Sequence, residues 1–146
     1  RYSNSAARAR GYRKAMEEAG APADPELTYE GNYSRTSGFE AASAVRRDLE
    51  RLDALVCAND RMAIGLIQGL RELGCRMPED LPVVGYDDSD AASLFDPPLT
   101  TVEVPFYEMG KLAAERLLEG RKSEEGREPF QETLSTRLIV RKSSLI

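Results

Sequence analysis

The sequence contains no histidine among its 146 residues and only two cysteines. Without an imidazole, the commonest general base, the histidine-activated nucleophiles and nearly all zinc sites are excluded. No apolar run approaches the roughly 18 residues that a membrane-spanning helix needs. These absences remove most hydrolytic and zinc-dependent activities and predict a chain without a membrane span.

The two cysteines, Cys57 and Cys75, are too few for a disulfide framework and lack the CxxC spacing of redox or zinc sites. We predict two free thiols in a reducing compartment, and hence a cytoplasmic protein. Cys57 lies in an apolar run, residues 54–58, that is typical of a buried strand. A thiol packed in the core is therefore expected there.

The charge balance is acidic. Lysine and arginine together number 20 against 25 aspartates and glutamates, a net charge of −5, and no basic run is dense enough to follow a phosphate backbone. This chain by itself is therefore not expected to bind DNA or an anionic membrane. The length fits one ordinary domain, but the chain begins at Arg1 rather than at a methionine, so we expect a piece of a longer protein.

The helical spacing of apolar residues predicts two helices in the first third of the chain. The first has Asn4 or Ser5 as its N-cap and ends at Gly20, and the second is capped by Ser37 and extends to Leu52. Between these helices the pattern predicts a short strand and a polar loop, at residues 27–29 and 31–38.

Two strand and helix units follow, and they carry the prediction of the fold. Residues 54–58 form an apolar run without polar alternation, typical of a parallel strand covered on both faces. The run leads into Asn59-Asp60, which can cap a helix over residues 62–73 that ends at Gly74. A second apolar strand over 81–86 ends at Asp87-Asp88. This alternation predicts an α/β fold with a parallel sheet flanked by helices, and ligands at the carboxyl ends of its strands.

The last third of the chain adds one helix and two strands to this prediction. A proline opens an amphipathic helix over residues 106–118. After a charged loop, short strands are expected over 130–134 and 136–141. In the second of these strands, Leu138 and Val140 are predicted to face inward.

No GxGxxG, GxxxxGK[ST] or GxSxG motif occurs, so the sequence lacks the usual dinucleotide, phosphate and nucleophile-elbow sites. Four individual side chains are nevertheless candidates for a ligand site. Asp87 ends an apolar strand, where a carboxylate can accept hydrogen bonds from a hydroxyl or amine ligand or serve as a turn residue. Asn59 offers an amide for ligand recognition or a helix cap. Arg8 offers a fork of donors or is simply exposed, and Tyr33 stacks on a sugar ring or fills its own loop. The residues themselves leave these alternatives open.

Several short segments form an ordered set along the chain. They are Arg8 to Tyr12, Gly31 to Ser34 with Gly38-Phe39, Ala58 to Gly65, Pro78 to Leu81, Val83 to Asp88, Pro97 to Val102, Glu108 to Gly110 and Leu138 to Ser144. Each segment alone is a weak signal. In this order and at this spacing they resemble the effector-binding domain of the LacI/GalR family of bacterial transcriptional repressors, and the resemblance covers nearly all of the chain.

The resemblance implies a periplasmic-binding-protein-like architecture, in which two α/β subdomains hold a small effector, often a sugar or a nucleobase, in the cleft between them. In such a homodimer the angle between subdomains controls operator affinity through N-terminal helix-turn-helix headpieces, which have no counterpart here. Residues 1–104 would be most of the C-terminal subdomain without its first strand and helix. Residues 105–135 would be a helix and strand of the N-terminal subdomain, and 136–146 a strand that returns.

Carried over position by position, the resemblance implies which residues bind the effector. Arg8 corresponds to the effector-binding arginine of the family, and Asn4 to a polar contact one turn before it. Tyr33 corresponds to an aromatic side chain that stacks on the ligand, and Asn59 and Asp87 correspond to polar contacts at strand ends. For Arg8 and Asp87 this favours a functional role over the structural alternative.

We therefore predict the ligand-sensing domain of a repressor-type bacterial regulator, with operator DNA bound only through the absent headpiece. No catalytic residue, metal or cofactor is expected. The alternative is the solute-binding protein of a sugar importer, which shares the architecture; a helix-turn-helix or a signal peptide before Arg1 would distinguish the two. A small hydrolase is less favoured, since no nucleophile stands with a base.

Overall fold

The structure, a computed structural model, describes residues 3–120 and 131–145. Its strands are short: β1 (Leu55–Val56), β2 (Val83–Val84), β3 (Thr101–Glu103) and β4 (Arg137–Ile139). β1 and β2 are parallel, and β3 and β4 are antiparallel. Parallel bridges from Val84 to Thr100 and from Asp87 to Glu103 join the two pairs. The predicted α/β fold with parallel strands is confirmed, and β4 adds an antiparallel strand to it.

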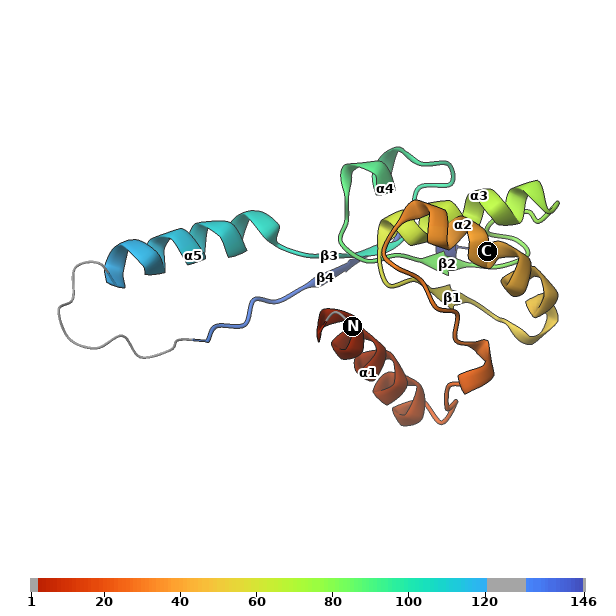
Figure 1. Ribbon diagram of the computed structural model, residues 1–146, viewed down its shortest axis with the longest axis horizontal. Coiled ribbons are helices and arrows are strands. Elements are labelled where there is room, and N and C mark those ends of the chain that lie inside the picture. The colour runs from red at the N-terminus through yellow and green to blue at the C-terminus, as the bar shows by residue number, and fades with distance from the viewer. Residues whose placement is uncertain (1–2, 121–130, 146) are drawn as a thin grey trace.

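Helices surround these strands. They are α1 (Ser3–Glu18), α2 (Arg35–Arg47), α3 (Asp60–Glu72), α4 (Asp90–Leu94) and α5 (Phe106–Gly120), with short 3-10 turns η1 (Pro25–Leu27), η2 (Leu49–Arg51) and η3 (Lys142–Ser144). Figure 1 shows α2 and α3 together on one side of β1 and β2, α1 on the other side, and α5 extending away beyond β3 and β4. The division into three parts at residues 104 and 135 stays a prediction.

The core lies where α2 and α3 pack on the strands. The apolar face of α3 supplies its centre, and Ile67 is completely buried. The two helices approach closely because glycines stand at their contact. A Cβ on Gly65 would collide with the carbonyl oxygen of Arg35, and one on Gly38 with that of Met62. This close packing fixes the N-terminus of α3 beside the ends of β1 and β2, where the candidate residues lie.

Local end signals were predicted correctly at two helices. Gly20 and Gly74 adopt positive φ angles of 72° and 82°, as expected of residues that end helices. After α1, the N–H of Ala21 donates to the carbonyl of Met16, and that of Gly20 to the carbonyl of Glu17. These two bonds satisfy carbonyl groups that the helix end would otherwise leave unpaired.

Two predicted N-caps are wrong. α2 begins at Arg35, and its cap is Ser34, whose hydroxyl accepts from the N–H of Ser37 at 3.0 Å. Ser37 therefore lies inside the helix. The described part of α1 already includes Asn4 and Ser5, so neither residue precedes the helix.

The strand predicted at residues 27–29 is wrong as well. Leu27 ends η1, which forms because Pro25 supplies a helical φ and the carboxylate of Asp24 accepts from the N–H of Glu26 at 2.9 Å. Residues 28–29 have no strand conformation. Of the strand predicted over 130–134, Phe130 lies outside the described residues, and residues 131–134 have no strand conformation. In both places the sequence contains a few apolar residues, but in the described part of the chain no neighbouring strand pairs with them, so no strand forms.

The predicted inward facing of Leu138 in β4, and of Val140 after it, is wrong. Leu138 and Val140 are 57% and 56% exposed, whereas Arg141 turns inward. The Arg141 guanidinium lies 2.7 Å from a carboxylate oxygen of Asp88 and donates to the carbonyl of Leu99 at 3.0 Å. These partners make burial of the arginine favourable, so the apolar residues beside it face outward.

Candidate functional site

Arg8 of α1 and Asp87 after β2 meet at the carboxyl ends of β1 and β2. One terminal nitrogen of Arg8 lies 3.2 Å from Asp87 Oδ1, and the other donates to the carbonyl of Ala58. The guanidinium carbon lies 3.8 Å from the centroid of the Tyr86 ring, a cation–π contact. The side chains of Arg8 and Asp87 are 22% and 26% exposed. The pair is thus held in place by protein but remains partly exposed.

The pKa of Asp87 shows that its charged form is not fully stabilised by the surrounding protein. Its pKa is raised, chiefly because burial disfavours the charged carboxylate, while the neighbouring Arg8 lowers the pKa and the nearby carboxylate of Asp60 raises it. One arginine therefore does not fully compensate the desolvated carboxylate. Hydrogen-bond donors from a ligand would add stabilisation that the ion pair alone does not supply.

The main chain at this site is strained. Asp87 and Asp88 have φ angles of 117° and 53°, and Tyr33 has 67°, a region that residues other than glycine seldom adopt. The N–H of Asp87 donates to the carbonyl of Val102 at 2.9 Å, and that of Asp88 to the hydroxyl of Thr101 at 3.3 Å. These contacts with β3 hold the two aspartates in their unusual conformation.

Asn59 joins the site to the loop that carries Tyr33. Its Oδ1 accepts from the N–H of Met62 at 2.9 Å, so the predicted helix cap of α3 is confirmed. Its Nδ2 donates to the carbonyl of Tyr33 at 3.1 Å, and the residue is 6% exposed. The side chain thereby fixes the loop of half-buried Tyr33 beside the end of β1. A direct contact of Asn59 or Tyr33 with a ligand stays a prediction.

Asn4 lies in the first turn of α1, and its side chain lies outside the described residues. Arg8 follows one turn later. It stands in the second turn of α1, and its side chain reaches the strand ends.

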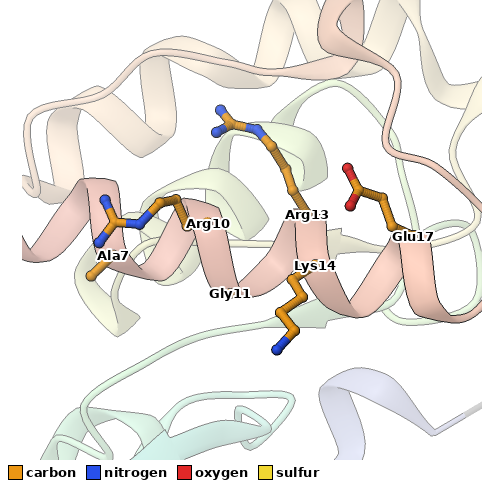
Figure 2. A pocket seen from close by; sticks show the side chains of 6 residues that line it. All are labelled: Ala7, Arg10, Gly11, Arg13, Lys14 and Glu17. Carbon is orange, nitrogen blue, oxygen red and sulfur yellow. The ribbon is translucent and has the colours of Figure 1, made fainter.

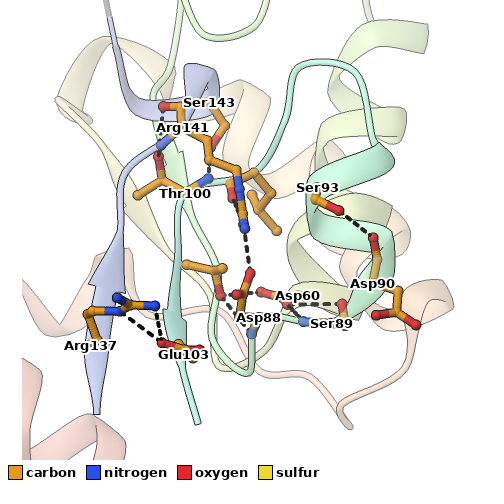
Figure 3. Close-up of polar contacts among 12 residues, drawn as sticks. Asp60, Asp88, Ser89, Asp90, Ser93, Thr100, Glu103, Arg137, Arg141 and Ser143 are labelled. Carbon is orange, nitrogen blue, oxygen red and sulfur yellow. Dashed lines mark hydrogen bonds and ion pairs between the residues drawn. The ribbon is translucent and has the colours of Figure 1, made fainter. Parts of the chain in front are cut away.

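Two residues that the sequence analysis did not assign to the ligand site, Tyr86 and Asp60, also belong to the arrangement. Tyr86 stands directly before Asp87, and an aromatic side chain at the carboxyl end of a strand was the available signal. Asp60, 1% exposed, follows β1 and lies beneath the site. Figure 3 shows it bonded to Ser89, beside the pair of Asp88 and Arg141.

A separate shallow pocket lies along α1. Its lining includes Arg10, Arg13, Lys14 and Glu17, and Figure 2 shows Lys14 pointing away from Arg13 and Glu17. Neither Arg8 nor Asp87 lines it. Within the described ranges no helix is long and apolar enough to cross a membrane. Over the same part of the chain, no group of three or more cysteine, aspartate or glutamate side chains is placed to hold a metal ion.

The class of protein follows from comparison with known sequences. Residues 1–144 match the family of periplasmic binding protein-like domains, and the chain belongs to this family. Within it, the resemblance to the effector-binding part of LacI/GalR-type regulators is confirmed by relatives and by solved structures.

Two relatives are named as HTH-type regulators. The chain is 45% identical over 109 residues to the transcriptional repressor PurR of Vibrio atlanticus strain LGP32, covering 75% of this chain and 33% of that protein. It is 39% identical over 135 residues to the regulator RegA of Clostridium saccharobutylicum, covering 92% of this chain and 40% of that protein. The chain thus spans well under half the length of these relatives.

Solved structures agree with the sequence matches. The complex of the regulator CelR with cellobiose superposes with a TM-score of 0.85 at 39% identity, over 94% of this chain and 42% of that one. The lac repressor dimer bound to operator and the anti-inducer ONPF superposes with a TM-score of 0.80 at 31% identity, over 95% of this chain and 47% of that one. The chain matches about half or less of each structure.

Proposed function

We propose that this chain is the ligand-sensing part of a bacterial LacI/GalR-type transcription regulator. The observation that carries the proposal is the partly exposed ion pair of Arg8 and Asp87 at the carboxyl ends of β1 and β2, the place where α/β folds bind ligands. The whole protein would bind operator DNA through a headpiece outside this chain, and would act as a cytoplasmic homodimer.

The chemistry of the pair indicates the class of effector. Arg8 provides only donors and the carboxylate of Asp87 only acceptors, so a ligand that satisfies both carries donor and acceptor groups side by side. Hydroxyl groups of a sugar and the edge of a nucleobase both do so. The ring of Tyr33, at the loop which Asn59 holds, is an aromatic group on which a flat or cyclic ligand stacks. We therefore propose an uncharged polar metabolite of one of these two classes.

A titration tests this proposal directly. The full-length protein that carries this chain is titrated calorimetrically with ribose, cellobiose, hypoxanthine and adenine. Arg8→Ala and Asp87→Ala are each expected to lower the affinity for the tightest-binding of these probes at least about tenfold, since a charge-assisted hydrogen bond is lost. Arg10→Ala, on the same helix but outside the site, is the matched control. Unchanged affinity in both site variants would refute the assignment.

The solute-binding protein of an importer shares the fold and stays the alternative. The relatives named above are regulators, which supports the regulator instead. The sequence encoded upstream of this chain separates the two: a helix-turn-helix supports the regulator, and a signal peptide supports the importer.

A further inference from the structure

Asp60 is a buried carboxylate whose described contacts surround the turn that carries Asp87. The residue is 1% exposed. Its Oδ2 accepts from the N–H of Ser89 at 2.7 Å and from the Ser89 hydroxyl at 3.0 Å, and its Oδ1 accepts from the hydroxyl of Thr101 at 2.6 Å. Its own N–H donates to the carbonyl of Tyr86 at 2.9 Å. The turn from residue 86 to residue 89 is thus bonded to Asp60 at both ends, and Figure 3 shows the bonds to Ser89.

The hydroxyl of Thr101 links Asp60 to Asp88, in the middle of the turn. Because a carboxylate can only accept, the Thr101 hydroxyl must donate to Asp60, which leaves its lone pairs free for the N–H of Asp88 at 3.3 Å. A relay therefore runs from Asp88 through Thr101 to Asp60. Since Asp88 has a φ of 53°, the relay holds in place a conformation that would otherwise relax.

The main chain before the turn is fixed against the same carboxylate. A Cβ on Gly85 would collide with Asp60 Oδ1, so only glycine allows this approach. We propose that Asp60 is the positioning residue of the effector site. It sets the strained turn so that the Asp87 carboxylate meets Arg8, and it does not touch the effector itself. The inference rests on the proposed function of Arg8 and Asp87.

The first test needs no effector. In the chain labelled with ¹⁵N-arginine, the guanidinium NMR signals of Arg8 are identified by their loss in Arg8→Lys. Asp60→Asn replaces one acceptor oxygen by a donor, and is expected to broaden or shift these signals as Asp87 leaves Arg8. Asp90→Asn, an exposed aspartate in the next helix, removes the same charge and is the control that leaves them unchanged.

A second pair of variants keeps the test decisive if Asp60→Asn does not fold. Thr101→Val removes the hydroxyl of the relay at nearly constant volume and is expected to broaden the Arg8 signals. Thr101→Ser retains the hydroxyl and is expected to restore them. Val45→Ala, in the core of α2, lowers stability away from the turn and should leave them unchanged. Arg8 signals that are unaltered in folded Asp60→Asn, or in Thr101→Val, would overturn the inference.

Affinity measurements separate this inference from the proposed function. With the best of ribose, cellobiose, hypoxanthine and adenine, Asp60→Asn is expected to weaken binding about tenfold, but to add nothing in an Asp87→Ala background, because it acts through Asp87. If Asp87→Ala leaves affinity unchanged, the proposed site fails. If Asp87→Ala weakens binding and Asp60→Asn does not, the positioning role alone fails.

Discussion

Ser143 in η3 ties the C-terminal segment to the sheet, and replacing it with alanine tests that attachment. Its hydroxyl donates to the carbonyl of Val83 at 2.6 Å and accepts from the N–H of Thr100 at 2.8 Å. Ser143, Val83 and Thr100 are 1%, 0% and 2% exposed, so water does not replace the lost hydroxyl. In Ser143→Ala two buried backbone groups therefore lose a partner.

The expected magnitude follows from these two groups. Each unsatisfied buried group costs about 1–3 kcal/mol, so we expect Ser143→Ala to lower the free energy of unfolding by about 2–6 kcal/mol. For a chain of this size, a loss of about 3 kcal/mol lowers the melting temperature by about 10 °C. Urea and thermal denaturation, followed by circular dichroism, measure both quantities.

The control for this prediction is Ser93→Ala. Ser93 is exposed, and its hydroxyl donates to the carbonyl of Asp90 at 3.0 Å on the surface of α4. Its replacement is expected to change the free energy of unfolding by less than about 0.5 kcal/mol. If Ser143→Ala proved as mild as this control, the buried hydrogen bonds would not stabilise the attachment as argued.

Three further predictions concern Asp87, the helix contact and Cys57. Because the folded pKa of Asp87 is raised, its contribution to stability is present below its unfolded pKa and is lost as pH rises through the folded pKa. Asp87→Asn should therefore raise the free energy of unfolding at pH 7, with no gain in acid below about pH 4; a destabilised variant at pH 7 would contradict this. Gly65→Ala, whose Cβ meets the carbonyl of Arg35, should lower the free energy of unfolding by about 2 kcal/mol or more. Gly11 has open space around it, so Gly11→Ala should raise the free energy of unfolding by about 0.5–1 kcal/mol. If urea denaturation showed Gly65→Ala to be the more stable of these two variants, the prediction would be wrong. Burial raises the pKa of the Cys57 thiol to about 12, so thiol reagents should label it only after unfolding, and rapid labelling of the native chain would refute this.

The sequence was most informative where the signal is local. A helix cap such as Asn59 or a helix-ending glycine such as Gly20 acts through hydrogen bonds and φ preferences within a few residues of itself. The apolar runs around Val56 and Val83 likewise predicted β1 and β2 and their parallel pairing. Ser37 was misassigned because several hydroxyls in one short loop compete for the same cap, and sequence does not rank them.

The candidate site was predictable only in part, for a related reason. Asp87 stands out in the sequence because a carboxylate follows an apolar strand, but Arg8 looks like any exposed arginine of a helix. The resemblance to a known family selected both residues, and the structure shows them 3.2 Å apart although 79 positions separate them in the chain. Nothing local to Arg8 encodes that distance.

By itself the sequence determined the α/β class, the strands β1 and β2 with α3 between them, and the candidate aspartate, because hydrophobic periodicity and end signals are properties of neighbouring residues. The tertiary structure alone decided which side chains meet. It turned Arg141 inward to Asp88, exposed Leu138 in its place, and buried Asp60 beneath the turn of Asp87. Those outcomes depend on partners far away in the chain, since a charged side chain is buried only where another segment supplies the opposite charge or the hydrogen bonds it needs.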